Sequence, residues 1–204
     1  MQLQKGAQMA TRGRPRSFDR DVALRHAIEV FWAKGYEGAQ LVDLTAAMGI
    51  NPPSFYAAFG SKEALFREAL ERYLATDGAR SLQALDTGTT ARDSILGMLT
   101  ASAEIALASP GARGCMLILG LVNGLPENDG LRLHLAGLRR ETTERIRRRL
   151  RRGVEDGDLP AGTDIDGLAT FFGTVIQGLS LQARDGASRE QLLAAASAAV
   201  KALD

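Results

Sequence analysis

The sequence predicts an all-α protein with about nine helices. Apolar residues recur at positions i, i+3 and i+4 in most segments, which is the spacing of one buried helix face. No segment shows the strict alternation of a half-buried strand, and glycines or prolines separate the periodic segments. The chain has 204 residues, of which 45% are hydrophobic, and this is enough for one buried core or two small ones.

The N-terminal third of the chain contains four of these helices. A first helix is expected over residues 19–34, and Gly35 is expected to end it because glycine adopts the left-handed conformation at low cost. A second helix is expected over residues 41–48 and a short third one over residues 52–59. A longer fourth helix is expected to begin at Ser61.

The remaining two thirds of the chain also show helical periodicity. The longest apolar run, residues 114–125, is interrupted by glycines and Asn123. It is too short for a bilayer, which needs about 20 residues. Longer helices are expected over residues 91–108, 129–152, 165–183 and 188–203.

Charge and cysteine content limit the class of protein. The net charge is +1, so the whole molecule is not a general polyanion binder. Cys115 is the one cysteine, so no internal disulfide can form, and the N-terminus lacks the apolar stretch of a signal peptide. We therefore expect a soluble cytoplasmic protein that has no membrane partner.

The stretch GINPPSFYAAFGSKEAL, residues 49–65, concentrates prolines and aromatic residues. Only residues 49–51 separate the second and third helices, and a turn of three or four residues with a glycine is the helix-turn-helix signature. Asn51 is a good N-cap residue. Pro53 is expected at the first helical position, where the missing N–H of proline has no helical partner to lose.

The aromatic residues of the short third helix divide by position. Phe55 and Phe59 lie four residues apart, so we expect them to hold this helix on the first two. Tyr56 points elsewhere, and a phenol on that side can donate to a DNA phosphate. Lys62 follows Ser61 in the first turn of the next helix, where a helix N-terminus and a lysine together suit a phosphate.

Residues 35–66 resemble the helix-turn-helix of the tetracycline-repressor (TetR) family of bacterial transcriptional regulators. The positions that match the family pattern are Asp43, Leu44, Gly49, Ile50, Tyr56, Phe59, Lys62, Glu63 and Leu65. The family commonly starts its second helix with two hydroxyl residues, where this chain has Ala39 and Gln40. The resemblance implies a ligand-responsive DNA-binding regulator, more often a repressor than an activator.

The recognition helix carries few hydrogen-bonding groups, so we expect modest direct readout of bases and a larger contribution from DNA shape. Gln40, Asn51 and Ser54 are the polar candidates for base edges. Pro52 and Ala57 are candidates for contact with thymine methyl groups.

A basic segment precedes the first helix. Its arginines suit a narrow minor groove, and its glycine and proline keep it non-helical, which predicts a DNA-binding arm formed by Arg12, Arg14 and Arg16. The alternative is a disordered basic tail that only adds charge. The predicted organisation is a disordered tail over residues 1–10, a DNA-binding domain over 11–70 and an effector-binding and dimerisation domain over 71–204.

The resemblance also implies a homodimer in which the last two helices of each chain form a four-helix bundle. Apolar and small residues cover more than one face of the segment 165–183, which agrees with this. A symmetric dimer would bind double-stranded DNA with a palindromic operator. The alternative is a buried monomeric core. The candidate interface residues are Leu168, Phe172, Ile176, Leu179, Leu193 and Val200.

In this family a small molecule often binds in the middle of the second domain and relieves DNA binding, so an effector of unknown identity is an expected partner. Methionine adapts to irregular apolar ligands, and Glu104 and Gln177 offer polar groups. Ordinary core packing is the alternative for each residue. The candidate lining residues are Met98, Ile105, Cys115, Met116, Leu119, Phe171, Val175 and Gln177.

Two further segments have competing interpretations. Arg113 and a helix N-terminus near Cys115 would favour its thiolate, which raises a redox or electrophile sensor as an alternative to a small buried apolar residue. The arginine-rich residues 138–153 are interpreted as a solvated helix face instead of a nucleic-acid site, because Leu138, Thr142, Ile146 and Leu150 form an apolar face there.

Two other classes of protein were weighed. An enzyme is disfavoured because the sequence has no metal-ligand spacing, nucleotide-binding loop or nucleophile motif, and no cofactor is expected. A non-specific architectural DNA-binding protein would explain the basic arm but not the apolar two thirds of the chain.

Overall fold

The structure is a computed structural model that describes residues 18–108, 111 and 113–204. Within these residues the fold is entirely helical, as predicted, with ten α-helices and two short 3₁₀ helices. None of these helices is long and apolar enough to cross a membrane. The α-helices are α1 (Arg20–Gly38), α2 (Leu41–Met48), α3 (Pro52–Phe59), α4 (Lys62–Ala75), α5 (Ala79–Thr87), α6 (Ala91–Leu107), α7 (Met116–Leu119), α8 (Asp129–Glu155), α9 (Ile165–Arg184) and α10 (Arg189–Val200).

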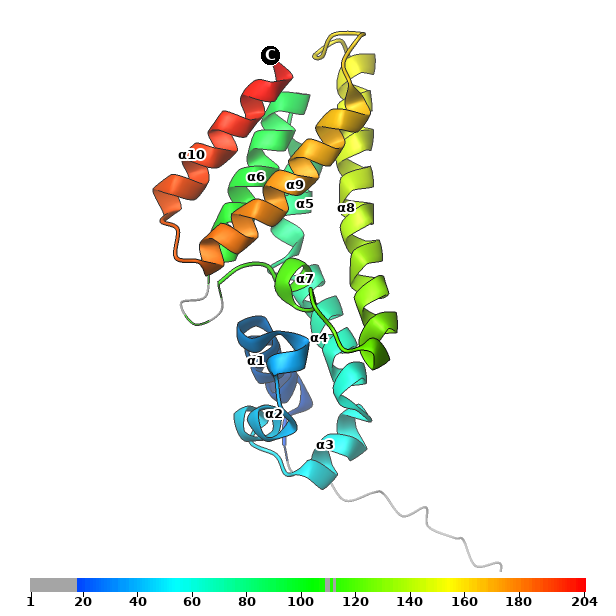
Figure 1. The fold of residues 1–204 in the computed structure, drawn as a ribbon, viewed down its shortest axis with the longest axis vertical. Coiled ribbons are helices and arrows are strands. Elements are labelled where there is room, and N and C mark those ends of the chain that lie inside the picture. The colour runs from blue at the N-terminus through cyan, green and yellow to red at the C-terminus, as the bar shows by residue number, and fades with distance from the viewer. Residues whose placement is uncertain (1–17, 109–110, 112) are drawn as a thin grey trace, which may run out of the picture.

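The elongated molecule has α1 to α3 at one end and the helices α5, α6, α9 and α10 at the other (Figure 1). The long helix α8 runs beside both parts, and α4 leads from α3 toward the second part (Figure 1). The arm residues Arg12, Arg14 and Arg16 lie outside the described residues, as does the tail over residues 1–10, so both remain predictions.

Two glycines end helices with a positive φ, as their positions in the sequence predict. Gly35 has φ 69° and interrupts α1, and the N–H of the next residue, Tyr36, leaves the helix to donate to the carbonyl oxygen of Gly120 at 2.7 Å. Gly49 has φ 65° and ends α2 at the turn before α3. These are conformations that side chains with a Cβ rarely adopt.

The third helix has the predicted bounds 52–59, but its first helical position is not the predicted one. Helix α3 begins at Pro52, not Pro53, because the side-chain oxygen of Asn51 accepts a hydrogen bond from the Ser54 N–H at 2.9 Å and caps the helix there. The segment after Ala75 forms the separate helix α5, since Thr76 has φ −119° and ψ −97°, which stops α4. No strong local signal in the sequence marks this break, and the additional helix α5 brings the number of α-helices in the described residues to ten.

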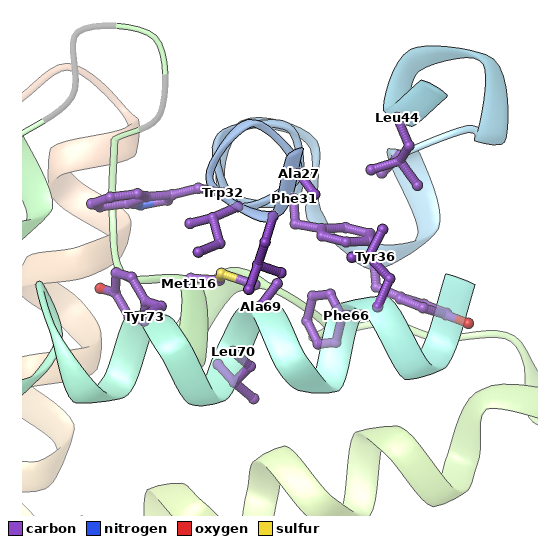
Figure 2. Packing of buried hydrophobic residues seen from close by; sticks show 14 of the residues in the cluster. Ala27, Phe31, Trp32, Tyr36, Leu44, Phe66, Ala69, Leu70, Tyr73 and Met116 are labelled. Atoms are coloured by element: carbon purple, nitrogen blue, oxygen red, sulfur yellow. The ribbon is translucent and has the colours of Figure 1, made fainter. Parts of the chain in front are cut away.

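An aromatic core joins α1 to α4 (Figure 2). Phe31 and Phe66 meet edge to face with ring centroids 5.0 Å apart, and Trp32 meets Tyr73 in the same way at 5.0 Å. Such pairs contribute about 0.5–1.5 kcal/mol beyond the area that they bury. Met116 of α7 packs in the same core, so α7 belongs to the support of the DNA-binding helices.

A second core lies among α5, α6, α8, α9 and α10. Its largest fully buried side chains include Phe172, Ile95 and Met98. The helices α6 and α8 contribute side chains to both cores, so they are able to transmit a shift from one core to the other.

The arginines of α8 contact acidic residues of neighbouring helices. Arg145 pairs with Asp86, and Arg147 pairs with Glu144 and Asp166. These pairs lie in the C-terminal half of α8, which is the half distant from α3 in Figure 1. These pairs support the interpretation of this segment as a solvated, ion-paired face, except at Arg149, which is buried and whose Nε donates to the Ser94 hydroxyl at 2.7 Å.

Candidate DNA interface and effector cavity

Helix α3 is anchored by one face and free on the other. Phe55 and Phe59 are buried, with ring centroids 6.1 Å apart, so the expected packing of α3 is confirmed. Tyr56 is 53% exposed and Ala57 is also exposed. The phenol of Tyr56, which is expected to contact a phosphate, is therefore exposed to solvent.

The predicted base-contacting residues lie around the start of α3 and α2. Asn51 and Pro52 are exposed and Ser54 is partly buried. Because the side-chain oxygen of Asn51 caps α3, its amide nitrogen is the group left for a base edge. Gln40 is exposed at the N-cap of α2, where it is available to DNA.

The first turn of α2 is fixed by a carboxylate. Asp43 accepts a hydrogen bond from the backbone N–H of Gln40 at 3.1 Å and forms an ion pair with Lys34 at 2.8 Å. The bond from Lys34, followed by that from Gln40, lowers the pKa of Asp43. This is how the chain holds the start of α2 without the hydroxyl cap that is common in the family.

Lys62 has a second role that the sequence did not reveal. Its Nζ lies 4.4 Å from the centroid of the Tyr36 ring. Burial lowers the pKa of Lys62, and the nearby Glu37 opposes this effect. The lysine therefore connects the first turn of α4, which Ser61 caps through the Ala64 N–H at 3.0 Å, to α1.

Sequence reasoning missed one exposed side chain on this surface. Val42 of α2 is 71% exposed. The signal was available, because Val42 falls outside the apolar pattern formed by Leu41, Leu44 and Met48. An apolar side chain at this position can contact a thymine methyl group or a sugar.

A cavity of about 60 Å³ opens between α4, α5, α6, α7, α8 and α9. Three of the predicted pocket residues line it, namely Ile105, Cys115 and Gln177. Sequence reasoning missed the lining residues of α4 and α8, since neither helix carried a pocket signal; they are Tyr73, Leu74, Arg139, Thr142 and Thr143.

The other predicted pocket residues are elsewhere. Met98 is fully buried in the second core and Met116 is 1% exposed in the first, because their helices turn these side chains away from the cavity. Leu119 follows the lining residues of α7 without lining the cavity itself. Phe171, 42% exposed, and Val175 lie on the outer side of α9.

Cys115 lines the cavity but is not set up as a thiolate. Burial raises the pKa of its thiol, while the hydroxyl of Tyr73, 3.3 Å from Sγ, acts in the opposite direction. The expectation that the helix N-terminus would favour the thiolate was wrong, because α7 has only four residues and burial outweighs it. The N–H of Cys115 donates to the Ser180 hydroxyl at 2.6 Å.

The segment 113–120 forms the cavity wall on one side and holds α1 on the other. Cys115, Leu117 and Ile118 line the cavity. The indole Nε1 of Trp32 donates to the Gly114 carbonyl oxygen at 2.5 Å, and Arg184 of α9 donates to the carbonyl oxygens of Trp32 and Arg113, each at 3.0 Å.

The outer face of α9 and α10 carries exposed apolar and small residues. The predicted interface residues Phe172, Leu179 and Val200 are not on it, because all three are at most 3% exposed and pack in the second core of their own chain. Leu168, Ile176 and Leu193 are partly buried, and Ile176 lines the cavity. The residues that the sequence analysis missed on this face include Leu181, 50% exposed, and Gly178.

The comparison with protein families assigns both parts of the chain. Residues 23–69 match the family of bacterial regulatory proteins named tetR, and residues 91–199 match the tetracyclin repressor-like C-terminal domain. In Escherichia coli K12, the HTH-type transcriptional repressor ComR is 33% identical over 90% of this chain and 88% of its own. The repressor BdcR of the same organism is 33% identical over 94% of this chain and 92% of its own.

A solved structure gives the same result. A cysteine mutant of the TetR family transcriptional regulator CifR, complexed with 26-bp double-strand operator DNA, has a TM-score of 0.89 and 48% identity to this chain, covering 94% of it and 100% of the CifR chain. These relatives are transcriptional regulators and not enzymes. With its helix-turn-helix, its all-helical second part and these matches, this chain belongs to the TetR family of bacterial transcriptional regulators.

Proposed function

We propose that this protein is a homodimeric transcriptional repressor that binds a palindromic operator and releases it when a small effector occupies the cavity. The observation that carries this proposal is the double role of the segment 113–120. Its side chains line the cavity, while its carbonyl groups accept hydrogen bonds from α1 of the DNA-binding part.

On the DNA side, α3 enters the major groove with its exposed face. Tyr56 and Lys62 contact phosphates, and Gln40, Asn51 and Ser54 approach base edges. Pro52 and Ala57 contact thymine methyl groups, and the arm formed by Arg12, Arg14 and Arg16 follows the minor groove. The operator complex of the relative CifR supports this arrangement.

On the dimer side, the outer face of α9 and α10 packs against its copy. Phe171 and Leu181 supply apolar area, and the small residues Gly178, Ala194 and Ala198 allow the helices to approach closely. A two-fold dimer sets the two α3 helices one helical turn of DNA apart or a multiple of it.

Release follows from a shift between two dimer states. An effector that binds better to the state with a wrong α3 spacing draws the population toward that state. An occupant of the cavity touches Cys115, Leu117 and Ile118, and any displacement there reaches α1 through Gly114 and Gly120.

Fluorescence anisotropy on the intergenic DNA beside the protein's own gene tests the DNA-binding part of this proposal. Saturable binding that survives excess nonspecific duplex at near-physiological salt supports a sequence-specific regulator. Strong salt dependence without sequence preference would instead favour an architectural DNA-binding protein.

A redox or electrophile sensor is the second candidate function, and one observation favours it. The Cys115 thiol lines the cavity, so a reactive compound that enters can reach it. The experiment compares operator release by oxidants and alkylating agents in the wild type and in Cys115→Ser. Equal release by both proteins eliminates the sensor.

A further inference from the structure

We infer that the cavity takes a small amphipathic acid, with an apolar body among α4, α6, α7 and α9 and an anionic oxygen group paired with Arg139. This inference rests on the proposed function, because it names the chemical class of the effector. It identifies Arg139 as the residue that selects this class.

Arg139 is the one charged residue among the described residues that line the cavity. It is partly buried, and its Nη1 donates to the carbonyl oxygen of Leu117 at 3.0 Å, which is its one hydrogen bond to the described part of the chain. A guanidinium has five N–H donors, so most of them remain for water or a ligand.

The other partly buried or buried arginines of α8 differ from Arg139 in one respect. Arg132, Arg145, Arg147 and Arg149 each lie within ion-pair distance of a carboxylate. No such pair is found for Arg139 in the residues that the structure describes. The fold thus places a cation against an apolar cavity and provides no acid for it.

The surroundings of Arg139 disfavour its charge. Burial is the main cause that lowers the pKa of the guanidinium, and the positive charges of Arg140 and Arg132 act in the same direction. Arginine nevertheless stays protonated. An incoming carboxylate would compensate this charge, and a planar carboxylate also fits the fork of the guanidinium.

Two hydroxyl groups of the lining on α8 are less suited to an anion. The hydroxyls of Thr142 and Thr143 donate to the carbonyl oxygens of Leu138 and Arg139, at 3.2 and 3.4 Å. Their protons are therefore engaged within α8. The cavity is small, with a volume of about 60 Å³, which indicates a short acid.

The experiment measures binding of matched pairs of compounds by isothermal titration calorimetry. The probes are butanoate, hexanoate and benzoate, each compared at millimolar concentration with its neutral amide. At least one carboxylate is expected to bind, and its amide roughly tenfold or more weakly, because a hydrogen bond to a charged group is lost.

Two variants locate the effect. Arg139→Gln is expected to remove the preference for the carboxylate, and Arg139→Lys to retain part of it because the charge stays but the fork is lost. Arg148→Gln is the matched control, since Arg148 lies exposed on the same helix. Circular dichroism establishes that each variant is folded, and the comparison of acid with amide on the wild type needs no variant.

The inference is overturned if no carboxylate of the panel binds, if the amides bind as tightly, or if Arg139→Gln leaves carboxylate binding unchanged. Operator binding, measured separately by anisotropy, distinguishes this failure from failure of the proposed function. A carboxylate that binds through Arg139 without releasing DNA leaves the inference standing and overturns the release mechanism. If a neutral compound releases DNA without dependence on Arg139, the inference is overturned and the release mechanism stands.

Discussion

The indole Nε1 of Trp32 and the carbonyl oxygen of Gly114 lie 2.5 Å apart, in a buried hydrogen bond between α1 and the cavity wall. Trp32 is also the only tryptophan of the chain. The bond joins two segments distant in sequence, and it connects the support of the DNA-binding helices directly to the residue before Cys115.

Trp32→Phe removes this bond and leaves the Gly114 carbonyl oxygen buried without that partner. We expect the free energy of unfolding to fall by about 1–3 kcal/mol, because a buried acceptor is left unsatisfied. Urea unfolding followed by circular dichroism measures this, since the variant has no tryptophan fluorescence. A loss well below this range would mean that water replaces the indole.

Tyr56→Phe removes an exposed hydroxyl from α3. Operator affinity is expected to fall by a few fold, which corresponds to about 0.5–1.5 kcal/mol for one hydrogen bond to a phosphate. Stability should not change, because Tyr56 is 53% exposed. Anisotropy on operator DNA gives the affinity, and an unchanged value would exclude the phosphate contact. Gln83→Ala, a change at an exposed position of α5, serves as a control.

Phe171→Asp places a charge on the outer face of α9. We expect the dimer to dissociate at concentrations at which the wild type is dimeric, because burial of an unpaired carboxylate is costly. Sedimentation velocity gives the association state. Thr170→Asp, at an exposed neighbouring position, is a matched control. A Phe171→Asp protein that remains dimeric would place the interface elsewhere.

The pH dependence of Cys115 follows from its raised pKa. Burial keeps the thiol protonated in the folded state above its ordinary pKa of 9.0. Alkylation by iodoacetamide is therefore expected to be slow at pH 7 and to accelerate only in alkaline solution. Above pH 9 the unfolded chain releases the proton that the folded chain retains, so the free energy of unfolding should decrease as pH rises.

Tyr73→Phe tests the hydrogen bond that opposes the rise in the thiol pKa. The Tyr73 hydroxyl lowers the thiol pKa, so its removal should slow alkylation further at a given pH. Mass spectrometry of the timed reaction gives the rates. Fast alkylation of the wild type at pH 7 would show that the thiol is more exposed to water than its packing indicates.

Much of the DNA-binding part could be predicted because its signals are local. Gly49 and Asn51 determine a turn and a cap through their own backbone and side chain, and Phe55 and Phe59 share a face by spacing alone. The phosphate contact of Tyr56 was inferred from its position on the other side of this helix, and it stays a prediction.

The second part was harder to predict because its site depends on helix rotation. Phe171 and Phe172 are equally apolar neighbours, yet the first lies 42% exposed on the outer face and the second is fully buried. In the sequence, Arg139 is one of several arginines on the same helix. Only the packing of α7 against α8 shows that it lines the cavity. Met98 was predicted to line the pocket because methionine adapts to irregular apolar ligands, but it is buried in the second core.

Tyr36 contacts both helix α4 of the DNA-binding part and the cavity wall. Lys62, in the first turn of α4, contacts the face of the Tyr36 ring, and the backbone N–H of Tyr36 donates to the carbonyl oxygen of Gly120 at the end of the cavity wall. Any free energy that an effector removes from operator binding through this residue must also act in reverse. Operator DNA would then weaken the affinity of the cavity for its ligand by the same factor, so the promoter itself would set the effector concentration needed for release.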